Sequence, residues 1–402
     1  MQGKRLLHRF IKESAEKMLH KKTSDSLVVV CEGLLKSRKL SVTGIGRAIE
    51  SKTTDKHCIK RVDRLVSNSL LEENRGIFYK ALAKKIVPRT GWCPILVDTS
   101  CLTADSKFQV IRASLAIDGR AFTLFEMTYK NGTLRKNWKI FLQKLGEILP
   151  EEKGHVIIIT DAGFHNKWFH LVREQKWDFI GRIRQDKNYT TSDGKSFPCK
   201  SLHKTATLKP THHGTVFLSK QSDNKAIICD LYSVKKKSKG RKMKTKLGNV
   251  KQGRYSKTIA KGQKEPWILA SSLPKSSFNS EQIVRLYSFR MQIEQSFRDM
   301  KNSRYGFSFK NTLTKGVSRL NILLLIAAIV NFIVWSVGVL AEQKNWHFKC
   351  QSNTSKKRTL SLFYLGTIIL KSESFDVTVP EINLALENIV FPSKTNIMER
   401  QL

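Results

Sequence analysis

Two aspartates follow apolar runs of the kind that form buried strands. Asp98 closes the run PILVD, and Asp161 closes the run VIIITD. A carboxylate at the end of a buried strand is costly without a counter-charge, and a divalent cation shared by two such acids would supply one. Mg²⁺ prefers hard oxygen ligands and keeps waters and substrate phosphates in its shell. One such acid alone is more often a turn residue or a helix cap, so the metal interpretation depends on the pair and on a third acid.

The third acid, Glu294, lies in a predicted helix that begins near residue 279 or 280 and ends near residue 300 or 301. Tyr287, Arg290, Glu294 and Lys301 stand at offsets of 0, 3, 7 and 14 residues, so a continuous helix would hold them within roughly 60° of one another. Glutamate could bind a metal ion there, while arginine and lysine would neutralise a phosphodiester. The alternative, an exposed charged face with i,i+4 pairs, accounts poorly for the tyrosine and for the spacing.

The charge of the chain is strongly unbalanced. Lys and Arg number 72 against 33 Asp and Glu among 402 residues, a formal net charge of +39. Such a chain repels itself unless an anionic partner is near, and DNA, RNA or an anionic membrane surface are the candidates. The positive residues are spread along the whole chain and are not confined to a tail. This distribution weakens the alternative that the protein is a ribosomal-type or simply alkaline protein. The length and the 40% apolar content indicate two to four globular domains.

Cysteine usage argues against two further classes of protein. The seven cysteines form no CxxC pair and their number is odd, which disfavours a zinc module and a secreted disulfide framework. The N-terminal segment MQGKRLLHRFIKESAEKM has no signal-peptide core. We therefore expect a reducing, cytoplasmic setting.

The segment that carries the two aspartates has the pattern of an α/β core. We predict a strand ending at Asp98, two strands within 108–129 joined by a turn at Asp118-Gly119, and a helix over 137–149. A strand ending at Asp161, a helix over 167–177 and a strand over 178–184 follow. Strands and helices that alternate in this way form an α/β sheet.

The N-terminal region is predicted to be helical and basic. Apolar spacing predicts helices over 5–19 and 25–35, a short helix capped by Thr43 that continues to Glu50, and a helix over 55–66 capped by Thr54. Two short helices around a small-residue turn are typical of a helix-turn-helix unit.

The helix over 55–66 has two distinct faces. Ile59, Val62 and Val66 form its apolar stripe. His57, Arg61 and Arg64 share another face, and these three residues are the candidates for DNA contact in the N-terminal region. A basic helix face is more often simply solvated, although the net charge of the chain favours a nucleic-acid role.

Three later segments have different textures. Residues 186–265 are polar and Lys-rich, with short strand-like pieces and the run KKKSKGRKMKTK, and we interpret them as an insertion in the core. The run is either a disordered surface loop or a phosphate-binding segment whose affinity falls with salt. The segment WILASSLP, 267–274, predicts a strand. The segment 322–341 is long and apolar enough to span a bilayer. We favour a buried central helix, because it is a solitary segment of this kind in the sequence.

These motifs resemble those of a known family. The spacing Y-x2-R-x3-E-x6-K, intact as Tyr287, Arg290, Glu294 and Lys301, resembles the signature of the bacterial IS-four insertion-sequence transposases, which include those of Tn-ten and Tn-five. ILVDTS and IITDAGF resemble the family's first two catalytic blocks. KEPWILASSLP resembles the block before the signature helix, particularly in the Tn-ten branch. The resemblance covers roughly residues 25–345.

The resemblance implies a fold and an activity. Residues 89–185 and 266–345 would form a ribonuclease-H-like catalytic core, with a β-rich basic insertion at 186–265 and a helical DNA-binding domain at 1–88. Residues 346–402 would be a C-terminal region with a possible part in dimerisation. The protein would be a DDE transposase that excises an insertion sequence by strand cleavage, hairpin formation and strand transfer at terminal inverted repeats.

The resemblance also assigns roles to residues. Asp98, Asp161 and Glu294 would bind two Mg²⁺ or Mn²⁺ ions. The other signature residues, Tyr287, Arg290 and Lys301, would contact phosphates, and Trp267 would stack on a flipped base. The implied partners are double-stranded DNA, as transposon ends and as target, and a second copy of the chain in a synaptic homodimer at the nucleoid.

Two other functions stay open from the residues alone. One is a different metal-dependent nuclease or recombinase on the same fold, which would need neither joining activity nor inverted repeats. The other is a non-enzymatic, membrane-anchored basic protein that uses residues 322–341. The second leaves the strand-end acids and the helical stripe unexplained.

Overall fold

The computed structural model describes the chain as two compact units. Among the residues described, the first comprises 2–93, 98–154 and 292–389, and the second comprises 94–97 and 155–291, with the gaps given next. The residues described are 2–15, 18–117, 120–184, 187–219, 226–237, 243, 245, 248–262, 265–303, 306–309 and 312–389, without the side chains of 259–262. Strand β1 (Trp92–Cys101) takes part in both units, since its residues 94–97 cluster with the second.

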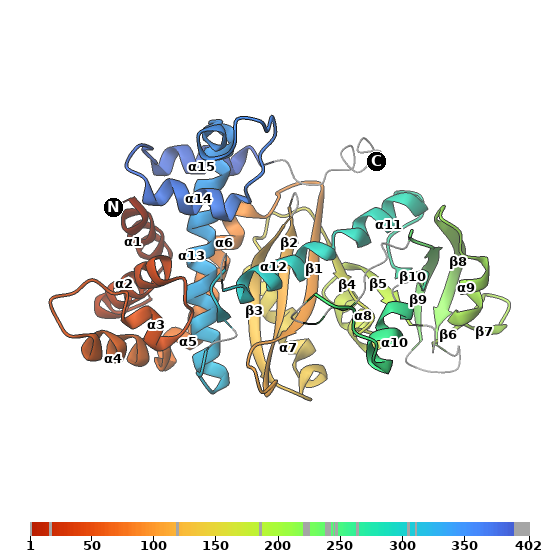
Figure 1. The fold of residues 1–402 in the computed structure, drawn as a ribbon. Coiled ribbons are helices and arrows are strands. Elements are labelled where there is room, and N and C mark those ends of the chain that lie inside the picture. Colours follow the sequence, from red (N-terminus) through yellow and green to blue (C-terminus); the bar gives the residue numbers. More distant parts are fainter. Residues whose placement is uncertain are drawn as a thin grey trace. The chain divides into compact units, whose positions relative to one another are not determined.

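The first unit begins with a group of helices (Figure 1). The apolar sides of these helices are buried. They are α1 (Gln2–Ala15), α2 (Lys21–Ser37), α3 (Val42–Gly46), α4 (Asp55–Val66), α5 (Ser69–Glu73) and α6 (Arg75–Ile86). The predicted cap of α3 was wrong. Ser41, not Thr43, accepts the hydrogen bond from the Gly44 amide, and α3 ends at Gly46 rather than at Glu50. Ser41 has the extended backbone of a helix cap, which places its hydroxyl over the first turn.

Helix α4 has the predicted bounds. Thr54 precedes it in extended conformation, but its side chain makes no capping hydrogen bond. Val62 and Val66 are fully buried, as the apolar stripe predicts. Helices α3 and α4 approach closely at Gly46, where a Cβ atom would lie 2.7 Å from the Cα of Ile59. The small residue in the predicted turn is therefore required by the packing of the two helices.

A sheet follows in the first unit. Strand β2 (Phe108–Ala116) pairs antiparallel with β3 (Ala121–Lys130), with a register shift between Ala113 and Ser114, and the strand order is β3-β2-β1. This pairing agrees with the predicted two-stranded segment, although the turn at Asp118-Gly119 itself lies outside the described residues. Helix α7 (Leu134–Ile148) covers β3, where Phe141 stacks on Phe125 at 5.4 Å.

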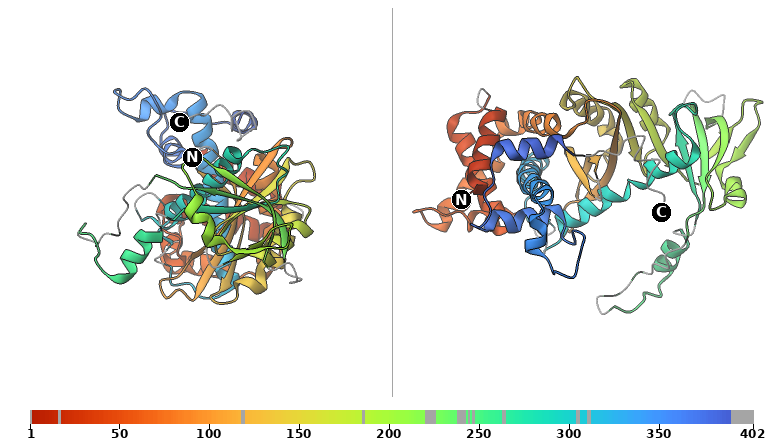
Figure 2. Two further views of the ribbon diagram at one scale, coloured as in Figure 1. Left: turned by 90° about the vertical axis from the view of Figure 1, so that its right-hand side faces the viewer. Right: turned by 90° about the horizontal axis from the view of Figure 1, so that it is seen from above.

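The apolar segment near residue 330 is a core helix of the first unit. Helix α13 (Val317–Gln343) packs against α2, β3, α14 (Leu362–Lys371) and α15 (Val379–Glu387), and Figure 2 shows it end-on between them. In length and composition it could cross a membrane, but 94% of its most apolar window is buried inside the chain. Gly338 lets α14 approach, because a Cβ there would lie 2.0 Å from the Leu362 carbonyl oxygen.

The second unit contains a mixed sheet. Its strand order is β1-β4-β5-β10-β9-β8-β6-β7, in which β4 and β5 are parallel and β10 pairs antiparallel with β5 and β9. The strands are β4 (His155–Thr160), β5 (Asp178–Ile183), β6 (Asn188–Thr190), β7 (Ser196–Pro198), β8 (Thr211–Leu218), β9 (Ile227–Val234) and β10 (Trp267–Ser271). The strand-like pieces of residues 186–265 therefore extend this sheet beyond β10.

Four helices of four or more residues accompany these strands among the described residues. They are α8 (Asn166–Glu174), α9 (Leu202–Thr205), α10 (Arg254–Gly262) and α11 (Ser280–Ser288). Helix α8 packs on β5 through Phe169 and Phe179, whose rings stack at 4.3 Å. The predicted sequence of strand, hairpin, helix, strand, helix and strand between residues 92 and 183 is confirmed.

The predicted long helix over 279–301 was wrong in one respect. It begins as expected, with a capping box between Asn279 and Gln282, but α11 ends at Ser288 and a second helix, α12 (Met291–Lys301), follows. Between them the amides of Phe289 and Arg290 bond three residues back, in a tighter turn. The Ser288 hydroxyl donates to the Arg285 carbonyl at 2.6 Å. This local bond competes with the regular helix ladder.

Candidate active site

Asp98 lies within β1 rather than at its end. The strand continues to Cys101, so the prediction of a strand-terminal acid was wrong here. The end of the apolar run marks the end of the buried part of the strand, not the end of the strand itself. Residues 93–97 are buried, whereas residues 98–100 are half-buried. The Asp98 carboxylate accepts the Thr99 amide at 2.7 Å. Burial raises the pKa of Tyr129, on β3, to about 12, and the nearby charge of Asp98 adds to the rise.

Asp161 stands where the sequence predicts it. It follows β4 directly and is half-buried. Its carboxylate accepts the Gly163 amide at 2.8 Å, which fixes the turn that leads to α8. In the sheet order β4 neighbours β1, so the two aspartates belong to neighbouring strands, each directly after a buried apolar run.

Glu294 lies half-buried in the first turn of α12. Contacts with β1 and with the residue that follows β2 fix this helix on both sides of Glu294. Before it, the Gln292 side chain accepts the Ile117 amide at 3.1 Å. After it, the Lys301 ammonium group donates to the Ser100 hydroxyl at 2.6 Å. The position of Glu294 is therefore set by the first unit's own sheet.

The contact between Lys301 and Ser100 relates Glu294 to Asp98. Asp98 and Ser100 lie on the same side of β1, because alternate residues of a strand do. Glu294 precedes Lys301 by seven residues, about two turns, and so shares its side of α12. The carboxylates of Asp98 and Glu294, far apart in the sequence, are thus associated with one face of this sheet, next to Lys301.

A buried ion pair lies under α12. Arg112 of β2 donates from two guanidinium nitrogens to Glu126 of β3, at 2.8 and 2.6 Å, and both side chains are almost completely buried. The same guanidinium donates to the Ser296 hydroxyl at 3.2 Å and lies 4.4 Å from the ring centre of Phe297. Burial raises the pKa of Glu126, while Arg112 opposes that rise. This pair anchors the helix that carries Glu294, and its separated residues gave no signal in the sequence.

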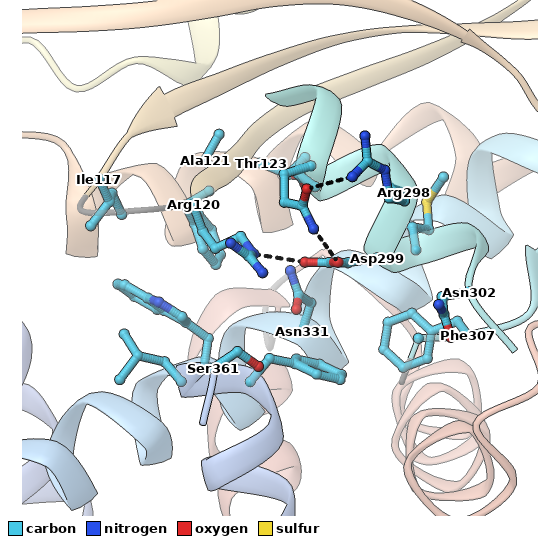
Figure 3. A pocket seen from close by; sticks show the side chains of 18 of the residues that line it. Ile117, Arg120, Ala121, Thr123, Arg298, Asp299, Asn302, Phe307, Asn331 and Ser361 are labelled. Atoms are coloured by element: carbon cyan, nitrogen blue, oxygen red, sulfur yellow. Dashed lines mark hydrogen bonds and ion pairs between the residues drawn. The ribbon is translucent and has the colours of Figure 1, made fainter. Parts of the chain in front are cut away.

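A cavity of about 510 Å³ lies beside α12 in the first unit (Figure 3). Gln295 and Asp299 line it from α12 and Asn302 from the residue after the helix, whereas Glu294 and Lys301 do not line it. Asp299 accepts Arg120 at 2.8 Å and Gln295 at 3.2 Å. The cavity therefore opens on a different side of the helix from Glu294, and its polar residues bind one another.

The first two residues of the signature lie in the second unit. Tyr287 is 1% exposed and meets the Trp267 ring edge to face at 4.9 Å. Arg290 lies 5.9 Å from the Tyr287 ring centre, and the Lys236 ammonium group lies 5.0 Å from the Trp267 ring centre. Lys236 is a neighbour of Trp267 that sequence reasoning missed.

Charged groups surround Tyr287. Burial raises its pKa, Arg290 and Arg182 oppose the rise, and the carboxylate of Asp161 adds to it. Tyr287 is thus electrostatically close both to Arg290 and to Asp161 within the second unit. The four signature residues do not share the single continuous helix that the spacing predicts, because Tyr287 precedes the helix break, Arg290 lies in it, and Glu294 and Lys301 follow it.

The N-terminal candidates are placed on α4. His57 and Arg64 are exposed, whereas Arg61 is half-buried and donates to the Ser26 hydroxyl of α2 at 3.2 Å. Arg61 therefore also holds two helices together.

The carboxylate oxygens of the three acids match the hard ligands that Mg²⁺ and Mn²⁺ take. In the described part of the chain, however, no three His, Cys, Asp or Glu side chains lie close enough together to hold a metal ion. The donor chemistry fits a divalent cation, and the three acids are divided two and one between the units.

Comparison with known proteins identifies the family. The sequence matches the family described as transposase DDE domain over residues 94–332, more than half of the chain. No curated protein matches the chain. The matched range includes Asp98, Asp161 and Glu294 together with the elements that carry them. Members of this family are enzymes that cleave DNA and transfer strands in the transposition of insertion sequences, generally with divalent metal ions. This chain belongs to the DDE-domain transposases.

Proposed function

We propose that this transposase excises and reinserts an insertion sequence by a cut-and-paste mechanism of the IS-four type, with Asp98, Asp161 and Glu294 as its catalytic carboxylates. The observation that carries the proposal is the bond between Lys301 and Ser100. It associates the helix of Glu294 with the strand of Asp98. Asp161 follows the strand next to β1 in the sheet order.

Two Mg²⁺ or Mn²⁺ ions are the proposed cofactors, with the three carboxylates as their protein ligands. Such ions, when bound, activate an attacking oxygen and stabilise the leaving oxygen of an in-line displacement. A lone buried carboxylate would be unfavourable, so the half-buried positions of Asp98, Asp161 and Glu294 suit groups that receive a cation.

The cationic signature residues have a charge-neutralising role in this proposal. Lys301 is held beside the strand of Asp98 by Ser100, and Arg290 lies close to Tyr287, which also senses the charge of Asp161. Either cation would stabilise the negative charge that spreads over a phosphodiester during displacement. Tyr287, almost fully buried, orients its neighbours Trp267 and Arg290 and offers at most its hydroxyl to a phosphate.

The proposed reaction consists of successive phosphoryl transfers. Water attacks the phosphodiester at a transposon end and leaves a 3′-hydroxyl. That hydroxyl attacks the opposite strand and closes a hairpin, which a second water reopens. The 3′-hydroxyl then attacks target DNA. Trp267 is half-buried beside Tyr287 and would stack on a base that is flipped out by the tight hairpin.

The remaining assignments follow from the same proposal. The catalytic core, residues 89–185 and 266–345, is ribonuclease-H-like, which the mixed sheet with parallel β4 and β5 supports. Residues 1–88 bind DNA through His57, Arg61 and Arg64 of α4, residues 186–265 form a basic insertion, and residues 346–402 contribute to a synaptic homodimer. The protein acts in the cytoplasm, at nucleoid DNA.

The hairpin gives the sharpest test of this mechanism. The purified protein is incubated with Mg²⁺ and a plasmid that carries its gene with the flanking DNA. We expect an excised fragment whose strands are joined at the ends and therefore run at double length on a denaturing gel. Trp267→Ala should reduce these joined ends more than it reduces first-strand nicking. Excision with open ends at every time point would contradict the hairpin route.

A further inference from the structure

The connection between β9 and β10 is unusual for two paired strands. The strands are antiparallel neighbours, with Trp267 opposite Val234, so a short turn could join them. Instead residues 235–266, here called the basic arm, separate the two strands in the sequence. Connections of this length are uncommon in compact domains, where they serve either a function or as linker segments.

The composition of the basic arm is one-sided. From residue 231 to residue 264 the sequence contains 13 Lys or Arg residues and no Asp or Glu. Such a segment repels itself, and a polyanion is the partner that relieves the repulsion. The chain belongs to a family that acts on DNA, so the complementary surface is a DNA strand.

One helix within the arm, α10, presents an aromatic ring among these cations. Tyr255 is 73% exposed, more than any other aromatic side chain in the described part of the chain. Arg254 and Lys257 are exposed as well, and around the helix Arg254 lies between Tyr255 and Lys257. Ser256, on the opposite side of α10, is buried. The helix thus turns its ring and two cations outward, and Figure 2 shows it standing away from the strands of the second unit.

The base of the arm adjoins the aromatic pair already described. Lys236, two residues after β9 ends, lies over the ring of Trp267, the residue at which β10 begins. Both ends of the arm therefore meet at Trp267, which contacts Tyr287. A DNA strand bound by the arm would therefore pass beside the rings of Trp267 and Tyr287.

We infer that helix α10 of the basic arm binds an unpaired DNA strand, with Tyr255 stacked on a base and with Arg254 and Lys257 on the neighbouring phosphates. An exposed ring serves a strand whose bases are unstacked, because duplex bases present no free face. Cations alone would serve either form of DNA. The inference rests on the proposed function, since nicking and hairpin opening are what would expose such a strand.

The test is binding of the full chain to a labelled single-stranded oligonucleotide and to a duplex of the same sequence. Divalent metal ions are left out, so no cleavage occurs and the result does not depend on the three carboxylates. Tyr255→Ala should weaken single-strand binding by about 5- to 100-fold and leave duplex binding nearly unchanged. Tyr255→Trp should restore it. Phe197→Ala, which changes another partly exposed ring of the second unit, is the matched control and should bind normally.

A second pair of substitutions tests the phosphate contacts. Arg254→Gln with Lys257→Gln should reduce the slope of log affinity against log salt by about 0.7 for each lost single-strand contact. Unchanged thermal unfolding would show that the variants are folded. Unchanged single-strand binding by Tyr255→Ala, an equal loss for both forms of DNA, or the same loss in Phe197→Ala would overturn the inference. Failure of the proposed mechanism would appear separately, as excision that does not need the three carboxylates.

Discussion

At the scale of single residues, the ammonium group of Lys301 joins two parts of the chain that the sequence separates widely. It donates to Ser100, on the strand face that also carries Asp98, and it shares a side of α12 with Glu294. The sequence indicated all four signature residues by type and spacing. It gave no sign of Ser100, because a serine in a strand is ordinary and its partner lies on a distant helix.

Removing the charge of Lys301 should slow DNA cleavage. Lys301→Met removes a charged hydrogen bond and a cation, which are worth about 1.5–3 kcal/mol together, so we expect a rate about 10- to 100-fold lower. Lys301→Arg should retain part of the rate, and Ser100→Ala should cost less than Lys301→Met. The rates would be measured on a labelled DNA end under single-turnover conditions. Lys107→Met, at an exposed loop lysine, serves as the control, and an equal loss there would refute a local role for Lys301.

A buried tyrosine predicts a specific pH dependence. Burial raises the pKa of Tyr232 to about 12, and its hydroxyl has no hydrogen-bond partner in the described part of the chain. The folded state therefore holds this proton more tightly than the unfolded state. Its contribution to stability is complete below about pH 10, the usual pKa of tyrosine, and declines as the pH rises toward 12.

Tyr232→Phe should remove that decline without a cost near neutral pH. We expect an unfolding free energy close to that of the unmodified protein at pH 8, and a smaller fall than in the unmodified protein at pH 11. Urea unfolding at the two pH values would measure both. If the variant and the unmodified protein lose the same free energy between these pH values, Tyr232 does not titrate as described.

At the scale of elements, the break between α11 and α12 is the feature that sequence patterns could not supply. Helical periodicity persists through residues 279–301, with neither proline nor glycine to interrupt it. The break instead follows from the Ser288 hydroxyl and the tight turn after it. The start of α11 was predictable, because its capping box consists of neighbouring residues. The Arg112–Glu126 pair was not, because it depends on how β2 and β3 register.

The buried pair gives a prediction for the stability of the first unit. Glu126→Leu leaves the Arg112 guanidinium buried without its carboxylate and should destabilise the protein by about 3–5 kcal/mol. The double variant Arg112→Met with Glu126→Leu should be more stable than Glu126→Leu alone, since it removes the unpaired charge. Chemical denaturation of the unmodified protein, the single variants and the double variant would give the unfolding free energies to be compared. A double variant that is less stable than either single variant would contradict this reading of the pair.

Helix packing gives a second prediction at this scale. Gly338→Ala would place a methyl group against the Leu362 backbone, where a Cβ comes within 2.0 Å of the carbonyl oxygen. Overpacking of this kind should cost about 1–3 kcal/mol and lower the melting temperature. Gly76→Ala is the matched control, because Gly76 lies in α6 with nothing within 4 Å of a Cβ. It should be neutral or stabilising, and equal effects of the two substitutions would contradict the packing argument.

At the scale of the whole molecule, composition and pattern predicted the α/β character and the burial of α13. The apolar segment of that helix could not by itself be told from a membrane span, and only its packing against α2, β3, α14 and α15 separates the two. The division into two units, with β1 in both, had no signal in the sequence. It depends on contacts between segments far apart in the chain. The composition does agree with DNA as the binding partner, because a net charge of +39 suits a protein that binds a polyanion.

The central claim is that Asp98, Asp161 and Glu294 act together in transposition, and plasmid excision tests it most directly. The gene with its flanking DNA is assayed for excision with Mg²⁺, for the unmodified protein and for Asp98→Asn, Asp161→Asn and Glu294→Gln. Asp193→Asn and Glu281→Gln, at exposed acids, are the controls. We predict that excision disappears in all three variants and persists in both controls. Excision that survives in any one of the three would contradict the triad as assigned.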